Sequence, residues 1–315
     1  MTLPYVEDLG HGVHAIDTGF HRPAFDAAYL VVEQGRAAFI DTGTNFAVPR
    51  LLGALLHLGL SPAAVDYVIP THVHLDHAGG VGLLMQSLPS ATLLVHPRGV
   101  RHMIDPGQLY QGALAVYGQA EMDRSYGRLV PVDASRVRPS ADELVIDLAG
   151  RPLLLIDTPG HARHHHCIWD ERSQGWFTGD TFGLSYREFD GPNGAWVMPT
   201  STPVQFDPAA LKHSIRRLTE KSPRCMYLTH YGRVTDVPRL ADLLVEQIDA
   251  MVVLAEGLKA SPARHQALKT ALTGLYRQQL QRHGAPSLEA GLAGLALDIE
   301  LNAQGLGIWL DSGKT

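Results

Sequence analysis

The sequence predicts an α/β protein whose core is followed by a helical extension, and two observations lead to this fold class. Up to about residue 237, short apolar runs typical of strands alternate with segments that carry apolar residues at helical spacing. Beyond that point the strand signals fade and amphipathic patterns continue toward the end of the sequence. We therefore expect a core domain over residues 1–237 and a C-terminal helical extension over residues 238–315.

The core domain contains short apolar runs bounded by turn residues, which predict β-strands. Helical spacing predicts three helices between them, and the last begins with Asp207 as N-cap and Pro208 at its first position. The expected helices lie within residues 45–60, 80–89 and 206–220. The expected strands lie within residues 12–19, 27–34, 36–43, 61–70, 91–97, 151–160, 166–170, 175–180 and 223–232.

The extension contains three apolar segments with helical character, over residues 238–258, 261–284 and 288–310. For the second segment we expect Ser261 as the cap and Gly284 as the end of the helix. One face of this helix is expected to carry four leucines, Leu268, Leu272, Leu275 and Leu280.

The overall composition limits the classes of function. A formal net charge of −6 over 315 residues argues against a nucleic acid or an anionic membrane as partner, because both require a basic face. A local basic patch is still compatible with this net charge. The two cysteines, Cys167 and Cys225, lie in apolar runs and are expected to be reduced. The first residues lack the apolar segment of a signal peptide, and no run of about 20 apolar residues occurs. We therefore expect a cytoplasmic protein without a membrane span.

The stretch THVHLDHAGG, residues 71–80, concentrates residues that can bind a metal ion. Side chains two apart in an extended loop point the same way, so His72 and His74 can reach one point together. Asp76 and His77 follow where a helix is expected to begin, and they would turn toward a neighbouring point. Imidazole and carboxylate groups suit Zn²⁺, Fe²⁺ or Mn²⁺, but two ligands at each point are too few for a tight site.

Further candidate ligands follow other apolar strands. His161 follows the strand in residues 151–160, Asp180 ends the run GWFTGD, and His230 lies in MYLTHYG. Each has the same context, in which an apolar strand leads through small or turn residues to a candidate ligand. Loops at one edge of a rigid sheet are where such sites are usually built. We therefore expect these residues to complete the site.

The H-x-H-x-D-H pattern at residues 72–77, followed in order by His161, Asp180 and His230, resembles the metallo-β-lactamase-fold hydrolase superfamily in its glyoxalase II and lactonase-like branch. The resemblance covers roughly residues 10–235. It implies a four-layer αββα sandwich that holds two divalent metal ions at one edge. Zinc is the favoured metal, while iron and manganese accept the same ligands.

The resemblance also implies how the ligands divide between the two metals. Asp180 would bridge the metals, and Asp41 in FIDTG would have a structural role beneath the metal loops. The first metal would be held by His72, His74 and His161, and the second by Asp76, His77 and His230.

The segment HARHHHC, residues 161–167, offers four histidines for one ligand position. In the family the ligand follows the Pro-Gly turn directly, which selects His161, and His165 matches a histidine that is not a ligand. We expect His164 and His166 to be loop residues or to support a ligand from behind. Arg163 either faces solvent or faces an anionic substrate.

The resemblance implies a hydrolase in which a hydroxide between the metals attacks an ester-like bond, with a thioester or a lactone favoured and a phosphodiester as a further option. Asp76 is the candidate catalytic residue, since it can orient this nucleophile while it binds its metal. Neither a G-x-S-x-G elbow nor a phosphate-binding loop of the Walker type occurs in the sequence.

Several branches of the superfamily fit less well. Secreted β-lactamases carry a signal peptide and typically a cysteine where Asp180 stands, and flavodiiron oxygen reductases carry a glutamate where His74 stands. RNA-processing members need a basic surface. In glyoxalase II and persulfide dioxygenase a Gly-Cys-Gly-Arg type of turn follows the bridging aspartate. In this chain the sequence after Asp180 is TFGLSYREFDGPNG, which lacks that turn.

We expect the substrate to be a small molecule with an apolar acyl or ring part, bound by two stretches outside the expected core. Residues 101–127 offer Met103, Tyr110, Tyr117 and Tyr126, and residues 183–200 offer Tyr186, Phe189, Trp196 and Met198. These residues could equally be packed loop residues. The C-terminal helices could cover the pocket or form the contact of a homodimer.

Two other functions are compatible with the sequence. A mononuclear iron dioxygenase of the persulfide type would use the first ligand set and leave Asp76, His77 and His230 idle. A regulator without catalytic activity would use the metals as a structural staple and the helical extension as a partner surface.

Overall fold

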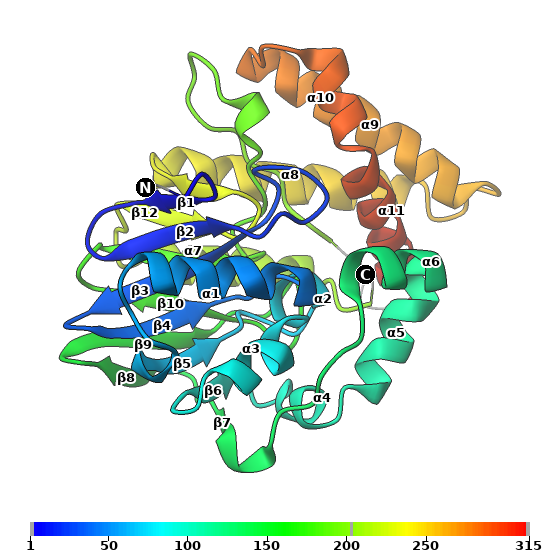
Figure 1. Cartoon of the computed structure of the whole chain (residues 1–315). Coiled ribbons are helices and arrows are strands. Elements are labelled where there is room, and N and C mark those ends of the chain that lie inside the picture. Colours follow the sequence, from blue (N-terminus) through cyan, green and yellow to red (C-terminus); the bar gives the residue numbers. More distant parts are fainter. Residues whose placement is uncertain (1–2, 202–203, 313–315) are drawn as a thin grey trace.

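The computed structural model describes residues 3–201 and 204–312, and within these residues it contains two β-sheets packed face to face with helices on both outer sides (Figure 1). The first sheet consists, in spatial order, of β1 (Val6–Asp8), β2 (Val13–Asp17), β3 (Ala27–Glu33), β4 (Arg36–Ile40), β5 (Val65–Ile69), β6 (Thr92–Val95) and β7 (Val137–Pro139). The second consists of β13 (Gly232–Val234), β12 (Cys225–Leu228), β11 (Gly175–Gly179), β10 (His166–Asp170), β9 (Arg151–Asp157) and β8 (Leu144–Leu148).

Both sheets change from antiparallel to parallel pairing, and the parallel pairs contain β5, β11 and β12, three of the strands that lead to the site. In the first sheet β1 to β4 pair antiparallel, whereas β4, β5, β6 and β7 pair parallel. Helices α1 (Val48–His57) and α3 (Val81–Ser87) supply the crossovers that parallel pairing requires. In the second sheet β11 and β12 are the parallel pair, and α7 (Pro208–Thr219) connects them.

The central strands of both sheets are buried on both faces, and alternate residues enter different hydrophobic layers. Tyr29 of β3 and Phe177 of β11 meet between the two sheets, with ring centroids 5.2 Å apart. Phe39 of β4 faces the other way, into the layer formed with α1 and α3. Trp176 of β11 faces α7, where its indole N–H donates to the carbonyl of Leu218 at 3.0 Å. The order helix, sheet, sheet, helix confirms the predicted four-layer αββα sandwich.

The C-terminal segments are helical, as predicted, but two details differ. The helices are α8 (Val237–Gly257), α9 (Arg264–His283), α10 (Leu288–Gly294) and α11 (Ala296–Asp311). The prediction of Ser261 as a cap was wrong: α9 begins at Arg264, because the backbone N–H of Ser261 still bonds to Leu258 at the end of α8. The third predicted segment is divided into α10 and α11 at Leu295.

These helices cover one side of the molecule and join the hydrophobic layer outside the second sheet (Figure 1). Leu268, Leu272 and Leu280 of α9 are buried as predicted, and Leu275 is partly buried. None of the helices among the described residues is long and apolar enough to cross a membrane. Cys167 and Cys225 are both free thiols and buried, as predicted.

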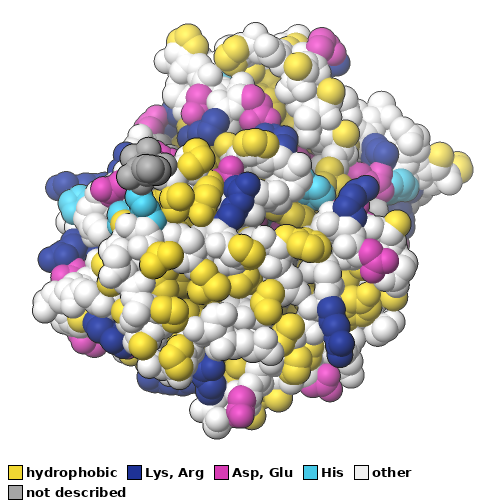
Figure 2. Space-filling model, in the orientation of Figure 1, with side chains coloured by type: hydrophobic (Ala, Val, Ile, Leu, Met, Phe, Trp, Pro, Cys, Tyr) yellow, Lys and Arg dark blue, Asp and Glu magenta, His cyan; other side chains and the backbone are white. Residues whose placement is uncertain are grey.

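Of the remaining elements, the sequence predicted only the helical turn at Asp76 and His77. Residues 100–126 form α4 (Val100–Ile104), α5 (Gly107–Tyr117), α6 (Gln119–Glu121) and a π-helical turn over Met122–Tyr126. Helix α2 (Leu75–Ala78) is a single turn in the metal-binding motif. On the face of the molecule shown in Figure 2, acidic, basic and hydrophobic side chains are interspersed.

Candidate metal centre

The predicted ligands meet at one edge of the sandwich, where parallel strands end. His72 and His74 lie in the loop after β5, and helix α2 carries Asp76 and His77. The other three candidates come from the second sheet: His161 follows β9, Asp180 follows β11 directly, and His230 follows β12. The carboxyl ends of β5, β11 and β12 therefore bring loops from both sheets to the same place.

One group of ligand atoms consists of three imidazole nitrogens. His74 Nδ1 lies 2.8 Å from His72 Nε2 and 3.1 Å from His161 Nε2. All three side chains can offer an atom to one ion, since their ligand atoms lie within 4.8 Å of one another. The sequence prediction placed these three histidines together, and the structure does so as well.

A second group contains carboxylate and imidazole atoms. His230 Nε2 lies 3.4 Å from Asp76 Oδ2, and His77 Nε2 lies 3.8 Å from the same oxygen. Asp76, His77 and His230 form a group whose ligand atoms are again within 4.8 Å of one another.

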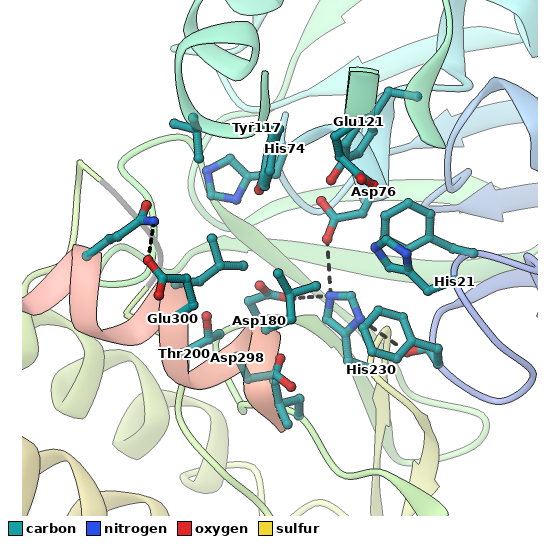
Figure 3. Close-up of a pocket in the computed structure, with 18 of the residues that line it drawn as sticks. His21, His74, Asp76, Tyr117, Glu121, Asp180, Thr200, His230, Asp298 and Glu300 are labelled. Atoms are coloured by element: carbon teal, nitrogen blue, oxygen red, sulfur yellow. Dashed lines mark hydrogen bonds and ion pairs between the residues drawn. The ribbon is translucent and has the colours of Figure 1, made fainter. Parts of the chain in front are cut away.

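Asp180 lies between the two groups and faces both. Its Oδ2 is 3.3 Å from His161 Nε2, whereas its Oδ1 is 3.2 Å from His77 Nε2 and 3.6 Å from His230 Nε2. Figure 3 shows Asp180 and Asp76 both next to His230, with their carboxylates directed at the same nitrogen of that imidazole. This is the position that a carboxylate shared by two metal ions requires.

The polar atoms at the centre fit a pair of cations. His77 Nε2 and Asp180 Oδ1 are buried, and although they lie 3.2 Å apart, neither makes a hydrogen bond of suitable geometry within the described part of the chain. Leaving such groups unsatisfied is unfavourable, and a cation between them would remove that cost. Nitrogen and carboxylate oxygen atoms are also the ligand types that zinc and related divalent ions prefer.

The match with known proteins agrees with this geometry. A family model described as the Metallo-beta-lactamase superfamily matches residues 22–230, which include all seven candidate ligands.

The chain belongs to the metallo-beta-lactamase superfamily.

The sequence identity between this chain and individual relatives is low. The chain is 26% identical over 247 residues to the metallo-beta-lactamase fold-containing protein ST1585 of Sulfurisphaera tokodaii, a match that covers 75% of this chain and 84% of that protein. The solved structure of ST1585 has a TM-score of 0.64 at 24% identity and covers 94% of this chain and 98% of the other. Because so much of this chain is covered, the similarity of fold extends into the C-terminal helices.

Two relatives carry names that state an activity. A hydroxyacylglutathione hydrolase of Xanthomonas euvesicatoria is 31% identical over 174 residues, which are 54% of this chain and 52% of that enzyme. The N-acyl homoserine lactonase AttM of Azorhizobium caulinodans is 31% identical over 108 residues, 34% of this chain and 36% of that enzyme. The chain thus spans about half or less of the length of these two enzymes.

Asp41 supports the second ligand group from behind, in the structural role that the family resemblance implies. It is buried at the end of β4, and its Oδ2 accepts from His77 Nδ1 at 2.8 Å and from the hydroxyl of Thr229 at 2.7 Å. Its Oδ1 accepts from the backbone N–H of Thr71 at 2.7 Å. One carboxylate therefore fixes the ring of His77 and two of the loops that carry ligands.

The other histidines of residues 161–167 have different roles. His165 lies behind the first ligand group, where its ring stacks on His72 with centroids 4.8 Å apart. His166 Nε2 donates to the carbonyl of Pro70 at 2.9 Å and so holds the start of the metal-binding loop. The ring of His164 lies 5.5 Å from that of His74, at the edge of the site. His164 is thus a loop residue beside the site, as predicted. His166 is the first residue of β10 and not a loop residue, and it supports the metal-binding loop from behind.

The pKa values of the histidines shift in opposite directions in the two groups. Burial lowers the pKa of His74 to about 3, and burial with neighbouring imidazoles lowers the pKa of His72 well below its ordinary value. Burial also opposes the charged form of His230, but Asp180 and the other carboxylates nearby outweigh it and raise the pKa to about 10. The pKa of His77 is raised for the same reason. The pKa of Asp180 is held well below its usual range, mainly by His77 against the effect of burial.

Sequence reasoning missed Asp26, which lies behind His230. Its carboxylate is fully buried, its Oδ1 lies 3.9 Å from His230 Nδ1, and its Oδ2 accepts from the hydroxyl of Thr18 at 2.9 Å. Burial raises the pKa of Asp26 to about 7. The available signal was an acidic residue at the entrance of an otherwise apolar strand, in FDAAYLVV.

The centre opens into a cavity of about 340 Å³, shown in Figure 3. Tyr117, Tyr126 and Tyr186 line it, as the sequence analysis proposed, and Phe20 and Phe25 were not predicted. The other proposed contacts pack elsewhere: Tyr110 packs partly buried against the hydrophobic core, and four are buried in it, namely Met103, Phe189, Trp196 and Met198.

Helix α11 forms one wall of this cavity. Leu297, Leu301 and Asp298 line it, and the hydroxyl of Tyr186 donates to Asp298 Oδ1 at 3.2 Å. Asp298 Oδ2 is buried with no hydrogen-bond partner among the described residues, and burial raises the pKa of this carboxyl to about 6. The sequence analysis left open whether the C-terminal helices cover the pocket, and the structure shows that α11 does.

Proposed function

We propose that this chain is a dinuclear metal-dependent hydrolase that cleaves an ester-like bond, either a thioester or a lactone. The observation that carries the proposal is the pair of ligand groups that meet at Asp180 and open into one cavity. The relatives named as a hydroxyacylglutathione hydrolase and an N-acyl homoserine lactonase support a hydrolytic reaction on acyl compounds.

In this proposal the first ion is held by His72, His74 and His161, the second by Asp76, His77 and His230, and both by Asp180. Zinc is the favoured ion, with iron or manganese as alternatives. When bound, such a pair lowers the pKa of a water molecule toward neutrality and polarises the carbonyl of the substrate.

The side chain of Asp76 orients the attacking water. It is 24% exposed and lines the cavity, while its Oδ2 faces His230. His77 and His230 hold the pKa of Asp76 well below its usual range, although burial opposes this, so the group is a carboxylate that accepts a hydrogen bond. Hydrolysis adds the water oxygen to the carbonyl carbon and breaks the bond from that carbon to sulfur or ester oxygen. The products are a carboxylate and a thiol or alcohol.

The aromatic side chains of the cavity support an apolar acyl or ring part in the substrate. Phe25 and Tyr186 stack with centroids 5.0 Å apart, and Phe20 lies 5.5 Å from Tyr126. Rigid rings of this kind bind apolar groups and keep water away from the reacting carbonyl.

The proposal is tested first by measuring metal content per chain and then by assays with p-nitrophenyl esters, acyl thioesters and lactones. We expect two metal ions per chain and loss of one in the His77→Ala or His230→Ala variant. The exposed His213 on α7 supplies a matched control, since His213→Ala removes an imidazole away from the site.

Activity on one of these substrate classes, lost in His74→Ala and kept in His213→Ala, would support the proposal. A single iron that is unaffected by substitution of His77 or His230 would contradict it and favour a mononuclear dioxygenase. Two metals with no turnover of any ester, and unchanged function in cells for Asp76→Ala, would instead favour a regulator.

A further inference from the structure

A second cavity adjoins the metal centre on the other side of His74. It has a volume of about 290 Å³ and shares His74, Val116 and Tyr117 with the first cavity. Its walls are apolar side chains of α5, such as Leu109 and Ala113, together with the amide side chains of Gln108 and Gln205. A group placed at the centre can therefore extend in two directions, into the aromatic cavity or along this passage with its two amides.

The passage leads to a wider basic pocket. This third cavity, of about 790 Å³, shares Arg101, His102, His164 and Gln205 with the passage. Arg98, Arg101 and Arg163 all line it, and Asp105 is the acidic residue in its lining. The carboxylate of Asp105 accepts from the backbone N–H of Gly107 at 3.1 Å and so caps a local turn.

These three arginines differ from many others on the surface. Arg36 pairs with Asp66, Arg217 with Asp142 at 2.9 Å, and Arg264 with Asp311 at 2.6 Å. Within residues 3–201 and 204–312, by contrast, none of Arg98, Arg101 and Arg163 has a carboxylate within 4.0 Å. Arg101 Nε donates to the imidazole of its neighbour His102 at 3.4 Å. Three guanidinium groups are thus available to one ligand.

The chemistry of this pocket favours a phosphate group. Guanidinium groups bind phosphate through paired N–H···O bonds, and several of them around one cavity match a group with more than one negative charge. The passage has apolar walls and two side-chain amides, which suit a flexible chain that itself contains amide groups. The aromatic cavity is lined by the rings of Phe20, Phe25 and Tyr186 and suits the apolar acyl part.

We propose that the substrate is a thioester whose thiol part is a chain with amide groups ending in a phosphate, and that Arg98, Arg101 and Arg163 bind this phosphate. The inference rests on the proposed hydrolase function and narrows it. A lactone has no separate leaving part, because its alcohol stays attached to the acyl chain, so the passage favours the thioester. Water adds to the thioester carbonyl, the bond from carbon to sulfur breaks, and the proton from water passes to the departing thiolate.

The test compares two probes that differ only in the phosphate, namely 4′-phosphopantetheine and pantetheine. Their binding to the metal-containing protein is measured by calorimetry and requires no turnover. We expect the phosphorylated probe to bind at least about tenfold more tightly, as charge-assisted contacts to two or three arginines imply. This advantage should decrease as the salt concentration rises.

The Arg101→Gln/Arg163→Gln double variant should lose the preference for the phosphorylated probe. Both side chains are exposed, so the variant is expected to fold, which circular dichroism verifies. Arg224→Gln is the matched control. Arg224 is also exposed, but it precedes β12 and so lies at the end of that strand away from His230. The control should keep the full preference.

Equal binding of the two probes, or a preference that survives in the double variant, would overturn the inference. So would inorganic phosphate that binds as tightly as 4′-phosphopantetheine, since the passage would then contribute nothing. These outcomes are separate from the hydrolase proposal: turnover of simple acyl esters without any phosphate preference would leave the hydrolase standing and remove only this inference.

Discussion

The two ligand groups share Asp180 but differ in charge, and the difference indicates how each would take up a metal. The first group consists of imidazoles among other imidazoles, where burial lowers the pKa of His74 to about 3. In the second group His77 and His230 face carboxylates, and the pKa of His230 is raised to about 10. The first group is therefore ready to bind a cation at neutral pH, whereas the second must release protons before it can do so.

The largest effect is expected from removing the residue that both groups share. Asp180→Ala should lower metal content below one ion per chain and reduce turnover on the order of a thousandfold, because the metal ions that would stabilise the charge of the transition state are lost with it. Metal analysis and steady-state kinetics check this. Asp242→Ala, an exposed aspartate of α8, is the control. A variant with two metals and normal turnover would show that Asp180 bridges nothing.

A smaller and selective effect is expected from Asp41→Asn. This change weakens the bond to His77 Nδ1 and should lower metal affinity of the second group about 10- to 100-fold, while the first group is little affected. Titration with a competing chelator measures both affinities. Asp66→Asn removes an aspartate from the opposite end of β5 and should leave both affinities unchanged. An equal decrease in the metal affinity of both groups would show that Asp41 does not support the second group selectively.

The pH dependence of metal binding should also separate the two groups. The raised pKa values of His77 and His230 mean that protons compete with the metal there, so affinity falls as pH falls, by about tenfold per pH unit for each proton displaced. At His74, whose pKa is about 3, protons do not compete with the metal ion between pH 5 and 8. Equilibrium dialysis over this range should show one ion lost before the other. Loss of both ions over the same pH range would contradict the difference between the two ligand groups.

The smallest effect is expected at Asp298, in the cavity wall. Its folded-state pKa of about 6 lies above the ordinary value of 3.8, so ionisation destabilises the fold, and stability is lost as pH rises from about 4 to above 6. Asp298→Asn removes this charge and should raise the Tm at pH 8 by roughly 2 °C or more, with little change at pH 4. Thermal unfolding at both pH values checks this. A lower Tm at pH 8 would mean that the carboxylate has a favourable partner.

The fold was largely predictable from local patterns, but short edge elements were not. An apolar run predicts a buried strand at β3, β4, β9 and β12. Strands β1, β7 and β13 have only three residues each, and β7 ends at Pro139, so none carries a strand pattern. Ser261 and Pro262 form a typical helix start, yet the turn that ends α8 continues through Ser261.

The candidate ligands could be predicted because their positions are local. Four of them lie within six residues: His72, His74, Asp76 and His77. In the extended loop residues two apart point the same way, and the helical turn that follows fixes the direction of the last two. His161, Asp180 and His230 each follow an apolar strand at a short distance, so their place at a sheet edge follows from the strand itself. How they divide between two metals rested on the family resemblance.

The sequence by itself therefore indicated the types of candidate ligand and their order, and the family resemblance that it carries implied the sandwich that holds them. Only the tertiary structure decided what surrounds the centre. Asp26 behind His230, α11 against the aromatic cavity, and the arginines at the end of the passage come from segments far apart in the chain. Their meeting depends on how whole layers pack, and an amphipathic pattern shows that a helix has a buried face without showing which surface that face will cover.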